Sequence, residues 1–247
     1  MGRREFLKKL PQWLRAKVGP DYQEIFALVE RASQIVGEGA LVLDAGAGEV
    51  PYKNLFLHTR YVALDFAKGD PGWDYSQLDI IGDLANMPLA DEAFDAVICT
   101  QVLEHVPEPW LVVKEINRVL RVGGHLFVSA PQWWFQHQKP YDYYRYTSFG
   151  LHYLFEQNGF EVRFIKPMGG YFWFLLVVLQ AFHAHLFPES GPLWWRWISY
   201  IPRRLVQLFF WFIVPLFLFY VDRLDKNQDF TLGYVCHCVK RKSIRES

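Results

Sequence analysis

Residues 41–51 of the chain read LVLDAGAGEVP. Three apolar residues, an acid and two closely spaced glycines predict a buried strand that turns sharply into a helix. Glycine lets the main chain adopt positive φ, and the turn leaves backbone N–H groups free to face a ligand. Pro51 suits the first turn of a helix over roughly residues 51–58, because its missing N–H costs nothing there. The stretch therefore predicts a ligand-binding turn after the first strand.

Apolar strands and amphipathic helices of 10–15 residues alternate around this turn. Such alternation is typical of a parallel, doubly wound sheet with helices on both faces. The predicted strands after the first are 61–65, 80–84, 94–99, 125–130, 160–165 and 231–239, and the predicted helices are 21–36, 106–120 and 148–157.

The glycine turn does not match the dinucleotide fingerprint G-x-G-x-x-G, because Pro51 stands where the third glycine belongs. Asp44 precedes Gly46 by two residues, and this D-x-G-x-G pattern resembles the motif of the class I S-adenosylmethionine-dependent methyltransferases, in particular the type 11 methyltransferases. The resemblance covers residues 40–166. It implies an α/β fold with a doubly wound, seven-stranded, mostly parallel Rossmann-like sheet, and S-adenosylmethionine as the cofactor.

The expected cofactor residues come from this resemblance and from the distance in sequence between Asp65 and the glycine turn. Asp65 ends the strand next to the glycine turn, about 20 residues beyond it, where a carboxylate can accept hydrogen bonds from both ribose hydroxyls; the alternative is an ordinary surface acid. The segment around Asp83 resembles the family's third motif, in which an acid accepts from the adenine amino group and the next residue lends its N–H. The expected cofactor-binding residues are Asp44, Gly46, Gly48, Asp65, Asp83, Leu84 and Thr100.

The loop 131–147 follows the fifth strand and should overhang the ligand-binding edge of the sheet. It resembles loops ending in P-x-D-x-x-R-x-T in one branch of the family, with Thr147 as the N-cap of the next helix. We predict that Asp142, Tyr144 and Arg145 contact the substrate, although Asp142 and Arg145 could instead pair to brace the loop. A neutral histidine suits removal of a proton from a methyl acceptor near pH 7. The candidate catalytic bases are His137 and then His105, with a structural histidine as the alternative.

Composition excludes several classes of function. The chain has 247 residues with 26 basic and 26 acidic side chains, so bulk charge does not favour a nucleic-acid partner. Cys99, Cys236 and Cys238 form no C-x-x-C pair and are odd in number, so we expect no metal site and no disulfide framework. A reducing, cytoplasmic setting follows from this cysteine usage.

Aromatic residues make up 18% of the chain and gather near its end. The segments 171–187 and 205–221 carry no charge, and they flank a mixture of aromatic and basic residues that begins at Trp194. Such a pattern favours shallow insertion into a membrane; the alternatives are a lid or homodimer interface, and a hairpin of two spanning helices. Residues 3–17 place basic side chains beside one apolar stripe, as in a helix lying on an anionic membrane or docked on the domain.

We therefore expect a basic amphipathic helix at 1–20, a methyltransferase domain at 21–166 and 229–247, and an apolar helical insertion at 167–228. The predicted function is a methyltransferase, peripheral or monotopic at the cytoplasmic face of a membrane, acting on a small-molecule or, more specifically, lipid-like or lipid-linked acceptor. One alternative is a soluble small-molecule methyltransferase whose insertion is a lid or dimer interface. The other is an inactive cofactor-binding scaffold protein, since a fold does not guarantee an activity.

Overall fold

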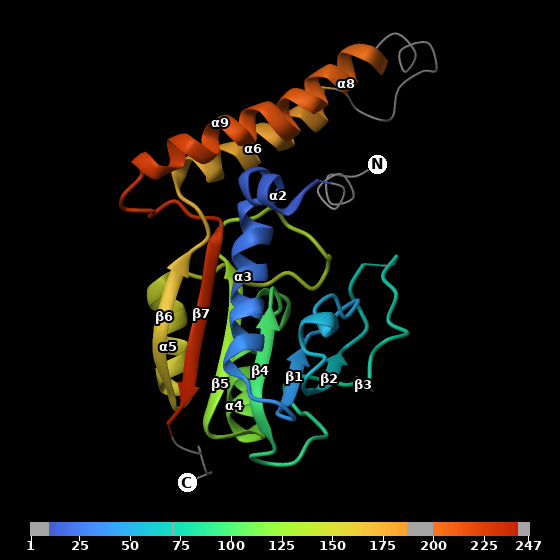
Figure 1. Cartoon of the computed structure of the whole chain (residues 1–247), viewed down its shortest axis with the longest axis vertical. Coiled ribbons are helices and arrows are strands. Elements are labelled where there is room, and N and C mark those ends of the chain that lie inside the picture. The colour runs from blue at the N-terminus through green and yellow to red at the C-terminus, as the bar shows by residue number, and fades with distance from the viewer. Residues whose placement is uncertain (1–9, 71, 187–199, 242–247) are drawn as a thin grey trace. The chain divides into compact units, whose positions relative to one another are not determined.

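The chain folds into two compact units (Figure 1). The sheet unit comprises residues 24–166 and 233–247, and the helical unit comprises residues 1–23 and 167–232. The computed structural model describes residues 10–70, 72–186 and 200–241.

The sheet unit is built on a seven-stranded sheet with the order β3-β2-β1-β4-β5-β7-β6. The pairs β1–β2, β1–β4, β2–β3 and β4–β5 are parallel, and β7 runs antiparallel to β5. The α/β fold, with its mostly parallel sheet and an apolar helical insertion before the last strand, is confirmed. The strands are β1 (Leu41–Ala45), β2 (Arg60–Asp65), β3 (Ile80–Ile81), β4 (Phe94–Thr100), β5 (Leu120–Pro131), β6 (Phe160–Pro167) and β7 (Gly233–Lys240).

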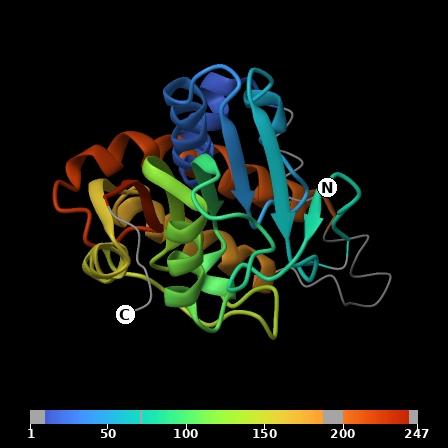
Figure 2. The same ribbon diagram turned by 90° about the horizontal axis from the view of Figure 1, so that it is seen from below.

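Helices cover both faces of the sheet. Helix α3 (Pro20–Ile35) lies on one face, and α4 (Pro109–Val119) and α5 (Ser148–Gln157) lie on the other (Figures 1 and 2). The residues 96–99 of β4 are fully buried, as expected for a central parallel strand with both faces covered. Thr147 caps α5 as predicted, because its Oγ1 accepts a hydrogen bond from the Gly150 N–H at 3.1 Å.

Two predicted helices differ from the structure. The segment 51–58 forms only the 3₁₀ turn η1 (Lys53–Leu55), because Phe56 is its one fully buried apolar side chain and no stripe exists to hold a longer helix on the sheet. Helix α4 begins at Pro109 rather than at Val106. The ring of Pro107 keeps Val106 extended, with φ −108° and ψ 135°.

The helical unit contains α2 (Gln12–Val18), α6 (Tyr171–Leu186) and a long run formed by α8 (Tyr200–Leu208), a π turn (Phe209–Ile213), α9 (Val214–Val221) and η4 (Asp222–Leu224). The carboxylate of Asp222 caps the start of α6, accepting from the N–H groups of Gly170, Phe172 and Trp173 at 2.9–3.3 Å. Lys17 of α2 donates to the Tyr220 hydroxyl at 2.8 Å. These contacts tie the two apolar segments and α2 together.

The apolar segments of the insertion are helical, as predicted. Within the described residues, one helix is long and apolar enough to cross a membrane, at Arg204–Leu224, by length and composition alone. The first part of the aromatic and basic mixture, residues 194–199, and the basic residues before position 10 lie outside the described residues, whereas Tyr200, Arg203 and Arg204 belong to α8.

Candidate functional site

The glycine turn follows the carboxyl end of β1 and is hydrogen-bonded to the carboxyl end of β2. Gly46 has φ +84° and Gly48 has φ +52°, so both glycines use the conformation that other residues avoid. The Gly46 N–H donates to the Leu64 carbonyl at 2.8 Å, and a Cβ added at Gly46 would lie 2.3 Å from a methyl group of Val102. Gly46 is therefore required by backbone conformation and by packing together.

Asp65 lies at the tip of β2 and faces this turn. One carboxylate oxygen accepts from the Gly48 N–H at 2.9 Å, and the other accepts from the Ala67 N–H at 2.7 Å. These bonds fix the orientation of the carboxylate, while each oxygen keeps a second lone pair for a ligand. The arrangement fits a ribose whose two hydroxyls donate to Asp65.

Asp44 is buried at the end of β1, and only 1% of its surface is exposed. Its carboxylate accepts a hydrogen bond from the Tyr61 hydroxyl, and no basic side chain of the described residues pairs with it. Burial raises the pKa of Asp44 to about 7, while the hydrogen bond from Tyr61 lowers it and the charge of Asp65 raises it. A buried carboxylate without a cationic partner fits a cofactor that carries a sulfonium and an ammonium group.

This buried charge has a measurable cost. We expect Asp44→Asn to increase the free energy of unfolding of the unliganded protein relative to wild type, by about 2–3 kcal/mol more at pH 8 than at pH 5. The wild-type carboxyl has a folded pKa of about 7 against its ordinary pKa of 3.8, so its protonated form favours folding. The stabilisation that protonated Asp44 gives the wild type is fully present below pH 4 and is lost as the pH rises through 7. Urea unfolding followed by circular dichroism at both pH values measures this free energy. Asp70 is exposed, so Asp70→Asn serves as a control that should show no such difference between the two pH values.

The remaining predicted cofactor residues lie at the same edge of the sheet. Asp83 is exposed just after β3, and its carboxylate accepts from the Ala85 N–H at 2.9 Å. Leu84 is buried, and Thr100 ends β4 in register with Ser129 of β5. The structure thus brings all seven predicted cofactor residues to the carboxyl ends of β1, β2, β3 and β4.

Trp73, to which the sequence pattern gave no role, packs on the glycine turn. A Cβ added at Gly48 would lie 3.0 Å from the indole ring of Trp73. Tyr75 supports the same loop, because its hydroxyl accepts from the Gly69 N–H at 2.7 Å. Two aromatic residues in an otherwise Gly, Pro and Asp-rich loop are the signal that could have indicated a cover for this site.

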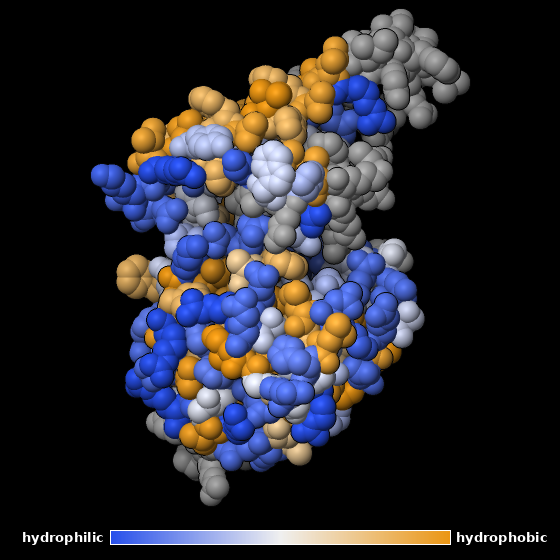
Figure 3. Space-filling model, viewed as in Figure 1, coloured by the Kyte–Doolittle hydropathy of each residue, from blue (hydrophilic) through white to orange (hydrophobic). Residues whose placement is uncertain are grey.

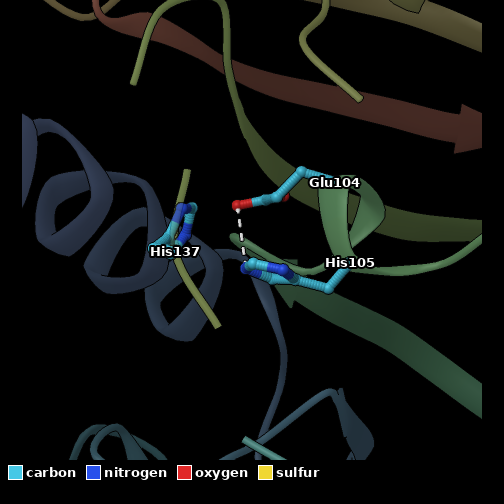
Figure 4. Close-up of side chains that lie close together, drawn as sticks. All are labelled: Glu104, His105 and His137. Carbon is cyan, nitrogen blue, oxygen red and sulfur yellow. Dashed lines mark ion pairs between the residues drawn. The ribbon is translucent and has the colours of Figure 1, made fainter. Parts of the chain in front are cut away.

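The predicted catalytic histidines meet beside the end of β4. His105 belongs to the 3₁₀ turn η2 (Leu103–His105), His137 belongs to the loop 131–147, and their rings contact edge to face with centroids 4.6 Å apart (Figure 4). The carboxylate of Glu104 lies 3.8 Å from His105 Nε2. Burial raises the pKa of Glu104 to about 8 and lowers the pKa of His105. The sequence analysis did not single out Glu104.

Two of the predicted substrate residues, Asp142 and Arg145, contact other residues of the loop 131–147, whereas Tyr144 contacts the segment before α4. Asp142 and Arg145 form a two-pronged ion pair at 2.7 and 2.9 Å, and Arg145 also donates to the carbonyls of Trp134 and Phe135. Arg145 lowers the pKa of Asp142 to about 2. The Tyr144 hydroxyl donates to the Pro107 carbonyl at 2.8 Å. This geometry matches the bracing alternative, and a substrate contact by these three residues stays a prediction.

Comparison with known proteins agrees with the site. A family model described as "Methyltransferase domain" matches residues 43–128. A probable S-adenosylmethionine-dependent methyltransferase of Mycolicibacterium smegmatis is 37% identical over 99 residues, which are 38% of each chain. A ubiquinone biosynthesis O-methyltransferase of Vibrio atlanticus is 31% identical over 99 residues, which are 40% of this chain and 38% of that protein. The chain thus spans about two fifths of the length of these curated relatives.

Among solved structures, a 4+2 cyclase has a similar fold, with a TM-score of 0.52 at 18% identity over 85% of this chain and 80% of that one. This likeness concerns the fold alone, and it shows that the fold also serves a reaction other than methyl transfer. The likeness to methyltransferases depends instead on the family model, whose matched residues 43–128 include the glycine turn, Asp65 and Asp83. Residues 43–128 match the methyltransferase domain, and about two fifths of the chain is similar to a probable S-adenosylmethionine-dependent methyltransferase.

Proposed function

We propose that this protein transfers the methyl group of S-adenosylmethionine to a lipid-like or lipid-linked acceptor at the cytoplasmic face of a membrane. The observation that carries the transfer activity is the arrangement of Asp44, the two glycines of the turn and Asp65 at one sheet edge, inside the segment that matches the methyltransferase family. The membrane and the acceptor class are supported by the insertion.

The chemistry requires orientation more than activation. Bound S-adenosylmethionine supplies a methyl group on a sulfonium that is already reactive, so the protein must align the acceptor for in-line displacement and exclude water. Asp65 holds the ribose, and Asp44 favours the cationic end of the cofactor. An acceptor hydroxyl must also lose a proton, and His105 and His137 are placed beside the end of β4 to assist this step.

The helix Arg204–Leu224 supports membrane binding. Only 17% of its most apolar window is buried, and Figure 3 shows hydrophobic side chains on the surface of the helical unit. Large exposed apolar side chains recur along the helix every three or four residues. A soluble monomer rarely exposes such a continuous apolar stripe. The ubiquinone biosynthesis relative adds support for a lipid-like acceptor. The exposed side chains of the stripe are Leu205, Phe209, Ile213, Phe217, Tyr220 and Leu224.

A charge on this stripe is expected to detach the protein from membranes. Phe217 is 65% exposed, and Phe217→Glu should lower the fraction that sediments with anionic liposomes by at least about tenfold, because the apolar ring is lost and a carboxylate must enter the interface. Phe149→Glu is the matched control, since Phe149 is 86% exposed on α5 of the sheet unit and should leave sedimentation unchanged. A wild-type protein that stays in solution as a dimer would show instead that the stripe is an oligomer interface.

The activity itself is tested with S-adenosylmethionine that carries a radioactive methyl group. The purified full-length protein is incubated with this cofactor and extracted membrane lipids, and we expect the label in the organic phase. Label confined to water-soluble molecules would favour a soluble acceptor. Cofactor binding without any transfer would favour the inactive scaffold.

A further inference from the structure

The hydrogen bonds of His105 and His137 determine which ring nitrogen is free. His105 Nδ1 lies 2.5 Å from the Tyr141 carbonyl oxygen, and His137 Nδ1 lies 3.0 Å from the Phe135 carbonyl oxygen. A carbonyl only accepts, so each Nδ1 carries the proton and each neutral ring keeps a lone pair on Nε2. Fixing a histidine tautomer through a backbone carbonyl is the usual support of a metal-binding imidazole.

Glu104 is completely buried beside these rings. Neither of its carboxylate oxygens, nor Nε2 of His105, has a hydrogen-bond partner among the residues that the structure describes. The nearby Arg145 forms its ion pair with Asp142 and not with Glu104. A buried acid whose two oxygens accept no hydrogen bond is costly, and a cation bound beside Glu104 would offset that cost.

We propose that Glu104, His105 and His137 bind one divalent transition-metal ion of the zinc type. Each residue offers one ligand atom, and the three atoms lie within 4.8 Å of one another, so small side-chain rotations bring them to one ion (Figure 4). The ligands come from two segments, η2 and the loop 131–147, which hydrogen bonds hold together. The N–H groups of Tyr143 and Tyr144 donate to the Glu104 carbonyl at 2.8 and 3.3 Å.

The donor set selects the class of metal. Two imidazoles and one carboxylate suit zinc, iron and their neighbours, whereas calcium and magnesium prefer oxygen ligands. Three protein ligands leave at least one coordination position open. Asp142 supports the loop that carries His137, because it accepts from the backbone N–H of His137 at 3.0 Å and is itself held by Arg145.

The role of the ion rests on the proposed function, although its binding does not. An oxygen of the methyl acceptor could occupy the open position. The positive charge would then favour the deprotonated acceptor, with its proton passing to water, before the oxygen–methyl bond forms and the sulfur–methyl bond breaks. The two histidines would thereby assist deprotonation through the ion rather than as direct bases.

Titration of the metal-free, full-length protein with Co²⁺ tests this site, because bound Co²⁺ absorbs visible light and Zn²⁺ should displace it. We expect one Co²⁺ per chain in the wild type and an affinity about 100-fold or more lower in Glu104→Gln. His152→Ala is the matched control, since His152 is a half-exposed histidine on α5 and should bind Co²⁺ as the wild type does.

A second measurement separates a metal ligand from a merely structural acid. Glu104→Gln keeps the shape of the side chain and removes a buried group that can ionise, so the melting temperature of the metal-free variant should equal or exceed that of the wild type. Absence of Co²⁺ binding by the wild type, or equal affinity in Glu104→Gln, would overturn the proposal. Calorimetry with S-adenosylmethionine on the same samples distinguishes the two proposals, because the metal site stands if Co²⁺ binds while the cofactor does not.

Discussion

Replacing Asp65 with alanine is expected to weaken S-adenosylmethionine binding by about 100-fold or more. The carboxylate is positioned to accept from both ribose hydroxyls, and each hydrogen bond to a charged group contributes about 1.5–3 kcal/mol. The variant also removes the acceptor of the Gly48 N–H, so the glycine turn itself becomes less well ordered. Isothermal titration calorimetry on the full-length protein measures the loss directly.

Asp70→Ala is the matched control for this experiment. Asp70 is an exposed acid in the loop that follows β2, so the substitution changes the net charge equally without touching the turn. We expect Asp70→Ala to bind the cofactor as the wild type does. Equal affinities of Asp65→Ala and Asp70→Ala would remove Asp65 from the cofactor site.

Gly46→Ala is expected to lower the free energy of unfolding by about 2–5 kcal/mol and to abolish cofactor binding. The left-handed backbone at φ +84° disfavours any residue with a Cβ, and the new methyl group would lie 2.3 Å from a methyl group of Val102. Val102 is branched and nearly buried, so its side chain cannot easily turn away. Urea unfolding and calorimetry report the two effects separately.

Two further variants isolate the causes. Gly37→Ala adds a methyl group where no atom lies within 4 Å and φ is not in the left-handed region, so it should be nearly neutral. The double variant Gly46→Ala with Val102→Ala removes the collision but not the backbone strain, and it should recover only part of the lost stability. A Gly46→Ala protein as stable as Gly37→Ala, with normal cofactor affinity, would contradict this account of the turn.

Local patterns predicted most of the sheet and the cofactor edge. The buried strands show as apolar runs, and Asp65 could be placed from its distance to the glycine turn, because neighbouring parallel strands end at the same edge. The helix over 51–58 was wrong because turn residues and a proline suggested a helix start where no apolar stripe followed. The predicted start of α4 at Val106 was too early, because the prediction did not take Pro107 and Pro109 into account.

The grouping of Glu104, His105 and His137 could not be predicted in the same way. His137 is 32 residues from His105 in the sequence, and only the return of the loop 131–147 onto η2 brings the two rings together. Sequence spacing therefore indicated no metal ligands. The pairing of Asp142 with Arg145 was visible as a spacing of three residues, but whether those charges face a substrate or each other depends on the fold of the loop.

We infer that the sheet edge formed by Asp44, Gly46, Gly48 and Asp65 binds S-adenosylmethionine. The most direct test is calorimetric titration of the full-length protein with S-adenosylmethionine and, separately, with NAD. We expect saturable binding of one S-adenosylmethionine per chain. We expect no binding of NAD, because Pro51 replaces the third glycine of the dinucleotide fingerprint. A folded protein that does not bind S-adenosylmethionine, or that binds NAD in its place, would contradict it.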